Sequence, residues 1–184
     1  MNGDYTIQAD DVAMLRRAGL SEPDLEHSLR VAEKGLEIAR RVKIGVDLEW
    51  VGRGALFHDL GKARTHAIEH GRIGAEMGQA LGLPQTITDL MEKHIRGGMT
   101  PEEADELGLP VKDYTLHAIE ERIVIYADRL VDIIWDGIVD LGSEQEAEEC
   151  FVKILNDNVQ YAKNTRTLER YLRYHAEIQG LMSV

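Results

Sequence analysis

Apolar residues recur along most of this chain at the three- and four-residue spacing of one helical face, and that spacing constrains the fold most. Leu25, Leu29, Ala32, Leu36 and Ala39 form the first such series, which is typical of an amphipathic helix that faces a core. Similar series follow, each bounded by residues that start or stop helices. No two segments show the pattern of paired strands. The sequence therefore predicts an all-α fold.

The start and stop signals divide the chain into eight expected helices. Ser21, Asp47 and Thr100 can each cap a helix, and Pro84 can open one, because these residue types favour the first turn. We expect helices at 21–45, 47–61, 73–81, 84–94, 100–108 and 115–135, a long one from 143, and an amphipathic one around 168–175.

The segments between the expected helices are short, and none has the composition of a linker between domains. With 184 residues, the chain is long enough for one domain with a substantial core. We predict a single domain over residues 1–184, with the functional motif in about 21–135 and additional helices over about 143–184. Those C-terminal helices would pack on the first part, and they offer a surface for a homo-oligomer contact.

The charges of the side chains disfavour several classes of partner. The chain has 33 acidic and 21 basic residues and a formal net charge of −12, so it should repel duplex nucleic acid and anionic membranes. A small anionic substrate is compatible, because bound divalent cations reverse the charge of a pocket. No apolar run reaches the length of a membrane span. The single cysteine, Cys150, and the polar residues 1–5 predict a cytoplasmic protein.

Six side chains that bind metals through nitrogen or oxygen carry the main functional signal. In chain order they are His27, His58, Asp59, His70, His94 and Asp128. His58 and Asp59 are adjacent, so on a helix they project about 100° apart and can straddle an ion near the helix end. Imidazole and carboxylate ligands suit divalent Fe, Mn, Co, Ni or Zn, and the mixture does not choose among them.

The order of these residues and their sequence context resemble the HD phosphohydrolase superfamily. The His-Asp pair lies in the segment GALFHDLGK (54–62), and Asp128 lies in IYADRL (125–130). The segments HGRIGAE (70–76) and KHI (93–95) resemble those of small archaeal HD-domain proteins. The resemblance implies an HD-type helical bundle that hydrolyses a phosphate ester or anhydride of a small nucleotide through a metal-activated water.

The resemblance also implies roles for individual residues. A first metal ion would be bound by His27, His58, Asp59 and Asp128, and a second by His70 and His94, with Asp59 as the bridge. Asp59 and Lys62 would be the catalytic residues, since the equivalent lysine of HD proteins faces the phosphate, where its charge stabilises the transition state. Arg96 and Arg129 lie near candidate ligands in the sequence and would also bind the phosphate.

Two other interpretations fit part of the sequence. Residues 66–70 match the His-x-x-Glu-His string of inverted zinc peptidases, in which the two histidines bind zinc and the glutamate activates water. The peptidase interpretation leaves His27 and the His-Asp pair unexplained. Under the phosphohydrolase interpretation, which we prefer, His66 lines the pocket or lies on the surface. The second alternative is a non-catalytic sensor that binds metal or nucleotide. Lys62, beside the full ligand set, favours the enzyme.

Overall fold

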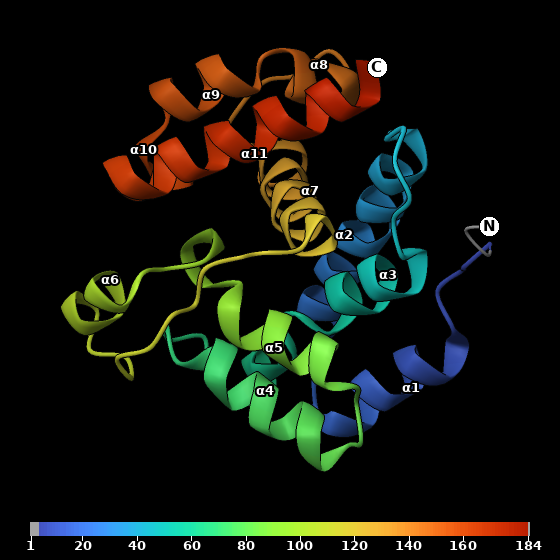
Figure 1. Ribbon diagram of the computed structural model, residues 1–184. Coiled ribbons are helices and arrows are strands. Elements are labelled where there is room, and N and C mark those ends of the chain that lie inside the picture. Colours follow the sequence, from blue (N-terminus) through green and yellow to red (C-terminus); the bar gives the residue numbers. More distant parts are fainter. Residues whose placement is uncertain (1–3, 184) are drawn as a thin grey trace.

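The computed structural model describes residues 4–183, so the ends of the predicted domain, residues 1–3 and 184, lie outside it. Over the described residues the fold is all α, as predicted, and contains no strand (Figure 1). The α-helices are α1 (Ala9–Ala18), α2 (Glu22–Arg41), α3 (Leu48–Phe57), α4 (His70–Ala80), α5 (Gln85–Lys93), α6 (Pro101–Glu106), α7 (Ile119–Trp135), α8 (Glu144–Glu149), α9 (Phe151–Asp157), α10 (Val159–Ala162) and α11 (Thr165–Ser183). Two short 3-10 helices are η1 (Leu60–Ala63) and η2 (Ile95–Gly97). None of the helices in this part of the chain is both long enough and apolar enough to cross a bilayer.

Helices begin at the caps that the sequence predicts. The side chains of Ser21, Asp47 and Thr100 each accept a hydrogen bond from the backbone N–H three residues later, at 3.3, 3.0 and 3.3 Å. Pro84 directly precedes α5. These four predicted starts are confirmed. The three side-chain caps each satisfy an N–H group that has no partner within the helix, whereas Pro84 forms no capping hydrogen bond and only precedes the first turn.

The first helix has no counterpart among the predicted ones. Its N-cap residue, Gln8, forms no capping hydrogen bond, so the local start signal is missing. Tertiary contacts hold α1 instead: Nε and Nη2 of Arg53 donate to the carboxylate of Asp11 at 2.9 and 3.0 Å. The position of α1 therefore depends on a residue far along the chain.

Several predicted boundaries are shifted, three of them by four residues. The helix from Ser21 ends at Arg41 rather than at residue 45, and the one predicted over 47–61 ends at Phe57, before η1. The helix predicted from residue 115 begins at Ile119. There the carboxylate of Glu121 accepts hydrogen bonds from the backbone N–H groups of residues 117 and 118 at 2.8 and 3.0 Å. These bonds fix the start of α7, because they satisfy donors that precede its first turn.

The prediction of one long helix from residue 143 is wrong. Ser143 does cap a helix, since its hydroxyl accepts from the Glu146 N–H at 3.3 Å, but the segment divides into α8, α9 and α10. Asn158 has an extended backbone, and its side-chain amide donates to the Ile154 carbonyl at 2.7 Å. An asparagine that bonds to the backbone in this way competes with the helix.

The hydrophobic core joins the first helices to the last ones. α2 packs against α3 and α7, and α4 packs against α5 and η1. Leu56, Leu90, Tyr126 and Phe151 are buried within one continuous cluster that reaches from α1 to α11. Figure 1 shows α8 to α11 as a layer on one side of α7, with α2 and α3 on another. α7 is therefore the element that the two parts of the chain share.

The C-terminal helix also holds the segment that follows α5. Nη1 of Arg170 donates to the carbonyl of Arg96 at 2.9 Å, and the hydroxyl of Tyr174 donates to the carbonyl of Gly97 at 2.8 Å. Arg170 also pairs with Glu103 at 2.5 Å, and both of these side chains are buried. α11 therefore fixes the position of η2, which lies at the edge of the pocket described below.

Candidate metal centre

The end of α3 places His58 and Asp59 at the centre of a group of histidines and carboxylates. His58 still has helical dihedral angles, whereas Asp59 has φ −100° and ψ 12°, and η1 begins at the next residue. Both side chains are buried. A Cβ atom on Gly61 would lie only 1.9 Å from the carbonyl oxygen of His70. η1 therefore approaches α4 closely enough to bring Asp59 beside His70.

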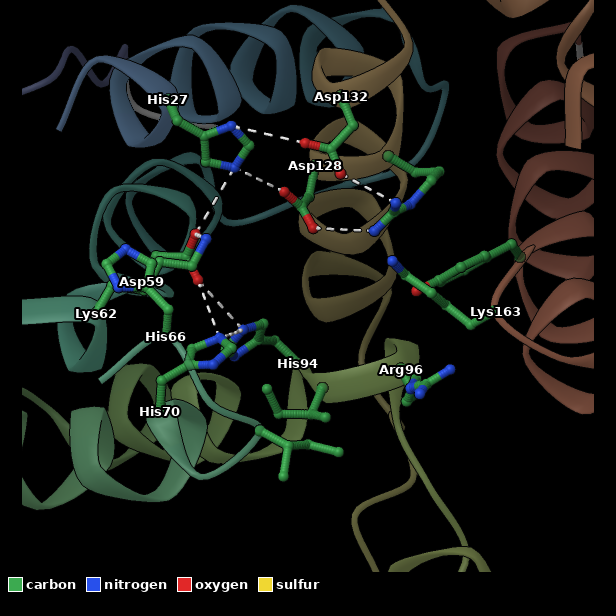
Figure 2. Close-up of a pocket in the computed structure, with 14 residues that line it drawn as sticks. His27, Asp59, Lys62, His66, His70, His94, Arg96, Asp128, Asp132 and Lys163 are labelled. Carbon is green, nitrogen blue, oxygen red and sulfur yellow. Dashed lines mark hydrogen bonds and ion pairs between the residues drawn. The ribbon is translucent and has the colours of Figure 1, made fainter. Parts of the chain in front are cut away.

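The two carboxylate oxygens of Asp59 face two different groups of imidazoles. Oδ2 lies 3.2 Å from Nε2 of His58 and 3.7 Å from Nε2 of His27. Oδ1 lies 3.2 Å from Nε2 of His70 and 3.5 Å from Nε2 of His94. Figure 2 shows Asp59 between His27 on one side and the His70–His94 pair on the other. This is the arrangement that a carboxylate bridging two ions requires.

The middle of α7 contributes Asp128 and one further acid that sequence reasoning missed. Oδ1 of Asp128 lies 3.0 Å from Nε2 of His27 and 3.5 Å from Nε2 of His58. Asp132 Oδ1 lies 3.8 Å from the other ring nitrogen of His27, Nδ1. Asp132 is four residues after Asp128, and this helical spacing is the signal that could have identified it.

The hydrogen bonds of three histidines leave their Nε2 atoms free to bind a metal. Nδ1 of each ring lies close to a backbone carbonyl three residues earlier, at 2.6 Å for His58, 2.8 Å for His70 and 2.7 Å for His94. A donor at Nδ1 leaves Nε2 as an acceptor in the neutral ring. Yet Nε2 of His70 and Nε2 of His94 are only 3.0 Å apart. Two lone pairs at that distance repel each other, and a cation between them removes the repulsion.

Burial and charge make the centre attractive to cations. Burial opposes ionisation of Asp59, but the contacts with His58, His70 and His94 hold its pKa well below the ordinary value. Burial likewise opposes protonation of His58, yet Asp59 and Asp128 raise its pKa to about 10, so a metal ion that binds Nε2 must displace a proton from this ring. Burial lowers the pKa of His94, which favours the neutral imidazole that metals bind.

The distances within the centre fit divalent metal ions. Two ligand atoms that each lie about 2.1 Å from one ion are separated by roughly 3.0–3.4 Å in octahedral or tetrahedral geometry. Most of the oxygen and nitrogen atoms described above are 3.0–3.5 Å apart. Three groups of side chains could each hold an ion: His27, His58 and Asp59; Asp59, His70 and His94; and His27, Asp128 and Asp132. The structure thus brings the six predicted ligands together, and their role in binding metal stays a prediction.

The centre opens into a pocket of about 410 Å³ whose wall carries several cations. Nζ of Lys62 donates to Oδ2 of Asp59 at 2.6 Å, so the lysine lies directly beside the centre. Arg129 is buried and pairs with Asp132 at 3.0 Å. The full lining is His27, Asp59, Lys62, His66, Ile68, His70, His94, Ile95, Arg96, Asp128, Arg129, Asp132, Lys163 and Tyr171. Lys163 and Tyr171 come from the C-terminal helical part, where no sequence signal pointed to the site.

The geometry does not support the peptidase interpretation. His66 is exposed, and its Nε2 lies 3.2–3.3 Å from the carboxylate oxygens of Asp24. His70 instead faces His94 and Asp59. Residues 66–69 form turns rather than a helix, so the two histidines do not present their rings to one ion as the peptidase motif requires. His66 lines the pocket, which is one of the two positions that the sequence predicted for it.

A pair of variants tests this choice between metal sites. We expect His27→Ala to weaken metal binding by at least about 10–100-fold. Loss of a residue that only hydrogen-bonds to a metal ligand already causes a loss of this size, and His27 is a candidate ligand itself. Glu69→Gln should leave metal content and hydrolysis near the wild-type values, because Glu69 is exposed and outside the centre. Metal titration and hydrolysis assays on both variants provide the measurement. The opposite order of severity would restore the peptidase interpretation.

The comparisons with known proteins show the family. Residues 24–131 match the HD domain family. The uncharacterized protein MJ0778 of Methanocaldococcus jannaschii is 38% identical over 165 residues, which cover 88% of this chain and 91% of that protein. The chain therefore belongs to the HD-domain family, which binds divalent metals. The resemblance predicted from the His-Asp pair and its context is confirmed.

Two further similarities are partial or distant. The tRNA (cytidine(56)-2'-O)-methyltransferase of Picrophilus torridus is 41% identical over 115 residues, which are 61% of this chain but 33% of that enzyme, so the match spans about a third of its length. The HD domain of the L. monocytogenes phosphodiesterase PgpH, solved with and without cyclic-di-AMP, aligns with TM-scores of 0.61 and 0.60. Its identity is 17% and 16%, over 91% and 94% of this chain and 96% and 99% of that domain. This likeness shows a shared fold.

Proposed function

We propose that this protein hydrolyses a phosphate ester or anhydride of a small nucleotide, with divalent metal at the centre around Asp59. Membership of the HD-domain family supports a metal-dependent phosphohydrolase. The observation that carries the proposal is the buried carboxylate of Asp59, whose two oxygens each face a separate group of histidine Nε2 atoms. When bound, a divalent ion lowers the pKa of a coordinated water and neutralises charge on the phosphoryl oxygens.

Two of the basic side chains in the pocket, Lys62 and Arg129, have definite tasks in this proposal. Lys62 lies within hydrogen-bond distance of Asp59. Its ammonium group can therefore stabilise the negative charge that develops on a phosphate bound next to that carboxylate. Arg129 is held by Asp132 and lies 3.7 Å from Asp128. We assign it mainly to orienting these two acids, and only secondarily to the phosphate contact that the sequence predicted. Arg96 lines the outer wall of the pocket.

Pocket size and charge support a nucleotide substrate. A cavity of about 410 Å³ lies within the usual range for sites that bind small molecules. The chain as a whole carries a net charge of −12, yet four basic side chains line this one pocket: Lys62, Arg96, Arg129 and Lys163. The HD domain of PgpH, which shares this fold, was solved in complex with cyclic-di-AMP, and this supports a nucleotide as the class of ligand.

Metal removal is the first test of the proposal. We expect purified protein to retain up to two divalent transition-metal ions per chain, because the centre contains two histidine groups that share Asp59. Chelation should abolish hydrolysis, and reloading with Mn, Fe, Co, Ni or Zn should restore it. Elemental analysis and a phosphate-release assay provide the measurements. A protein that cannot be reloaded with any of these metals would contradict the assignment of the centre.

A substrate panel separates the enzyme from the sensor. The metal-loaded protein should release phosphate or nucleotide from at least one mononucleotide, deoxynucleotide, cyclic nucleotide or dinucleoside polyphosphate. If none of these compounds is cleaved while both metals are present, whether or not it binds, the non-catalytic sensor becomes the better interpretation of the protein's function. An Asp59→Asn preparation, purified in the same way, controls for contaminating phosphatase.

A further inference from the structure

Two residues with unusual backbone geometry both present a basic side chain to the pocket. Among residues 4–183, Arg96 and Lys163 are the non-glycine residues with positive φ, at 56° and 64°. Lys163 is the central residue of a tight γ-turn, because the N–H of Asn164 donates to the carbonyl of Ala162 at 2.7 Å. Such a turn is rare and strained. Strain of this kind persists where the surrounding structure requires it, and it is concentrated at functional sites.

The cationic groups of these two residues form no direct ion pair within the described part of the chain. Over the described part of the chain, no carboxylate oxygen lies within 4.0 Å of either cationic group, whereas Lys62 and Arg129 both form ion pairs. Burial lowers the pKa of Lys163, and the positive charges of Arg129 and Arg96 lower it further, whereas the carboxylates of Asp132 and Asp128 oppose this shift. Lys163 and Arg96 thus add positive charge to the pocket wall without direct ion-pair partners among the described residues.

The position of the two residues relative to the metal centre separates their role from that of Lys62. Figure 2 shows Lys163 and Arg96 on the side of the pocket away from His27 and Asp59. Lys163 lies beyond residues 24–131, the region that matches the HD family. Arg96 is held by the hydrogen bond from Arg170 on α11. Both cations are therefore positioned by the C-terminal helices of this chain.

We propose that Lys163 and Arg96 form a second anion subsite, which binds a phosphate of the substrate other than the one that is cleaved. This inference rests on the proposed function, because the scissile phosphate is taken to lie at the metal centre. The substrate class that follows is a nucleotide with at least two phosphate groups. One phosphate would lie at the metal centre around Asp59, beside Lys62. The other would pair with the two cations on the opposite wall.

Binding measurements on metal-loaded protein test the subsite. The probes are adenosine monophosphate and three relatives with a second phosphate: adenosine diphosphate, adenosine 3′,5′-bisphosphate and the linear dinucleotide pApA. In these probes the second phosphate is adjacent to the first, across the ribose, or one nucleotide away. At least one of them should bind about 10-fold more tightly than the monophosphate, the gain expected from one charge-assisted contact. For any probe that is cleaved, KM and kcat are measured in addition.

Three variants and one control identify the residues responsible. Lys163→Gln and Arg96→Gln should each remove most of the preference for the second phosphate. Lys153→Gln is the matched control, because Lys153 is 79% exposed on α9 and away from the pocket. Lys163→Gly removes the same charge and also relieves the strained turn. It should lose the preference while its melting temperature stays equal or rises, an outcome that a purely structural role of Lys163 does not give.

The possible outcomes separate this inference from the proposed function. If no probe binds more tightly than the monophosphate, or if Lys163→Gln and Lys153→Gln behave alike, the subsite is wrong even when hydrolysis occurs. If the preference is present and depends on Lys163, but the metal-loaded protein cleaves neither these probes nor any compound of the substrate panel, the subsite stands and the hydrolase proposal fails. Cleavage of a bisphosphorylated probe, with a higher KM in Lys163→Gln, supports both.

Discussion

Replacing Asp59 with alanine should abolish hydrolysis and remove metal from both histidine groups. Each of its oxygens faces a different pair of Nε2 atoms, so one substitution removes a ligand from two positions. We expect the rate to fall by at least about 10³-fold, the upper end of what loss of a single electrostatic donor costs, because the source of the nucleophile is lost as well. Elemental analysis and phosphate release measure the two effects.

Two controls accompany the Asp59 experiment. Asp59→Asn keeps the size of the side chain and tests whether loss of charge alone is sufficient, with circular dichroism to verify the helical fold. Asp105→Ala removes an exposed carboxylate from α6, outside the pocket, and should behave as the wild type. Full metal content together with an undiminished rate in Asp59→Ala would rule out the bridging role.

Substitution of Gly61 with alanine should damage both stability and the second histidine group. The added Cβ would lie 1.9 Å from the carbonyl oxygen of His70 and 2.7 Å from the backbone nitrogen of Gly74. Both are backbone atoms of α4, which cannot rotate away, so η1 and α4 must separate. We expect a loss of about 3 kcal/mol, which corresponds to a melting temperature lower by roughly 6–12 °C in a chain of this size.

The Gly61 prediction has a matched control within the same chain. Gly180 lies in α11, and nothing lies within 4 Å of the position that its Cβ would occupy. Gly180→Ala should therefore keep or slightly raise the melting temperature, since alanine favours the helix. Thermal unfolding of the two variants, followed by metal titration, gives the measurement. Equal melting temperatures for the two variants would mean that η1 and α4 do not require this close approach.

The sequence predicted the parts of this molecule that depend on local signals. Caps such as Ser21 and Asp47 satisfy donors within three residues, so they are visible without knowledge of the fold. The order of the six candidate ligands was also sufficient to predict that they meet, although His27 and Asp128 are 101 residues apart. That inference came from resemblance to a family, because no local rule brings such distant residues together.

The parts that the sequence did not predict depend on tertiary contacts. α1 is fixed by the ion pair between Asp11 and Arg53, and the break at Asn158 depends on whether its side chain bonds to the backbone. Lys163 has no motif around it, and its place in the pocket follows from the path of the chain between α10 and α11. Such features arise from packing, so sequence periodicity carries no signal for them.

The hydrogen bonds from α11 to η2 give the C-terminal helix an influence on the candidate metal centre, to which it contributes no candidate ligand. Arg96 and Gly97, whose carbonyls accept from Arg170 and Tyr174, follow His94 by two and three residues. A chain that ended before α11 would keep all six candidate ligands and still lose the support behind one of them. Two proteins with identical HD motifs can therefore differ in how firmly they hold the histidine proposed to bind a second ion, according to the helix that follows.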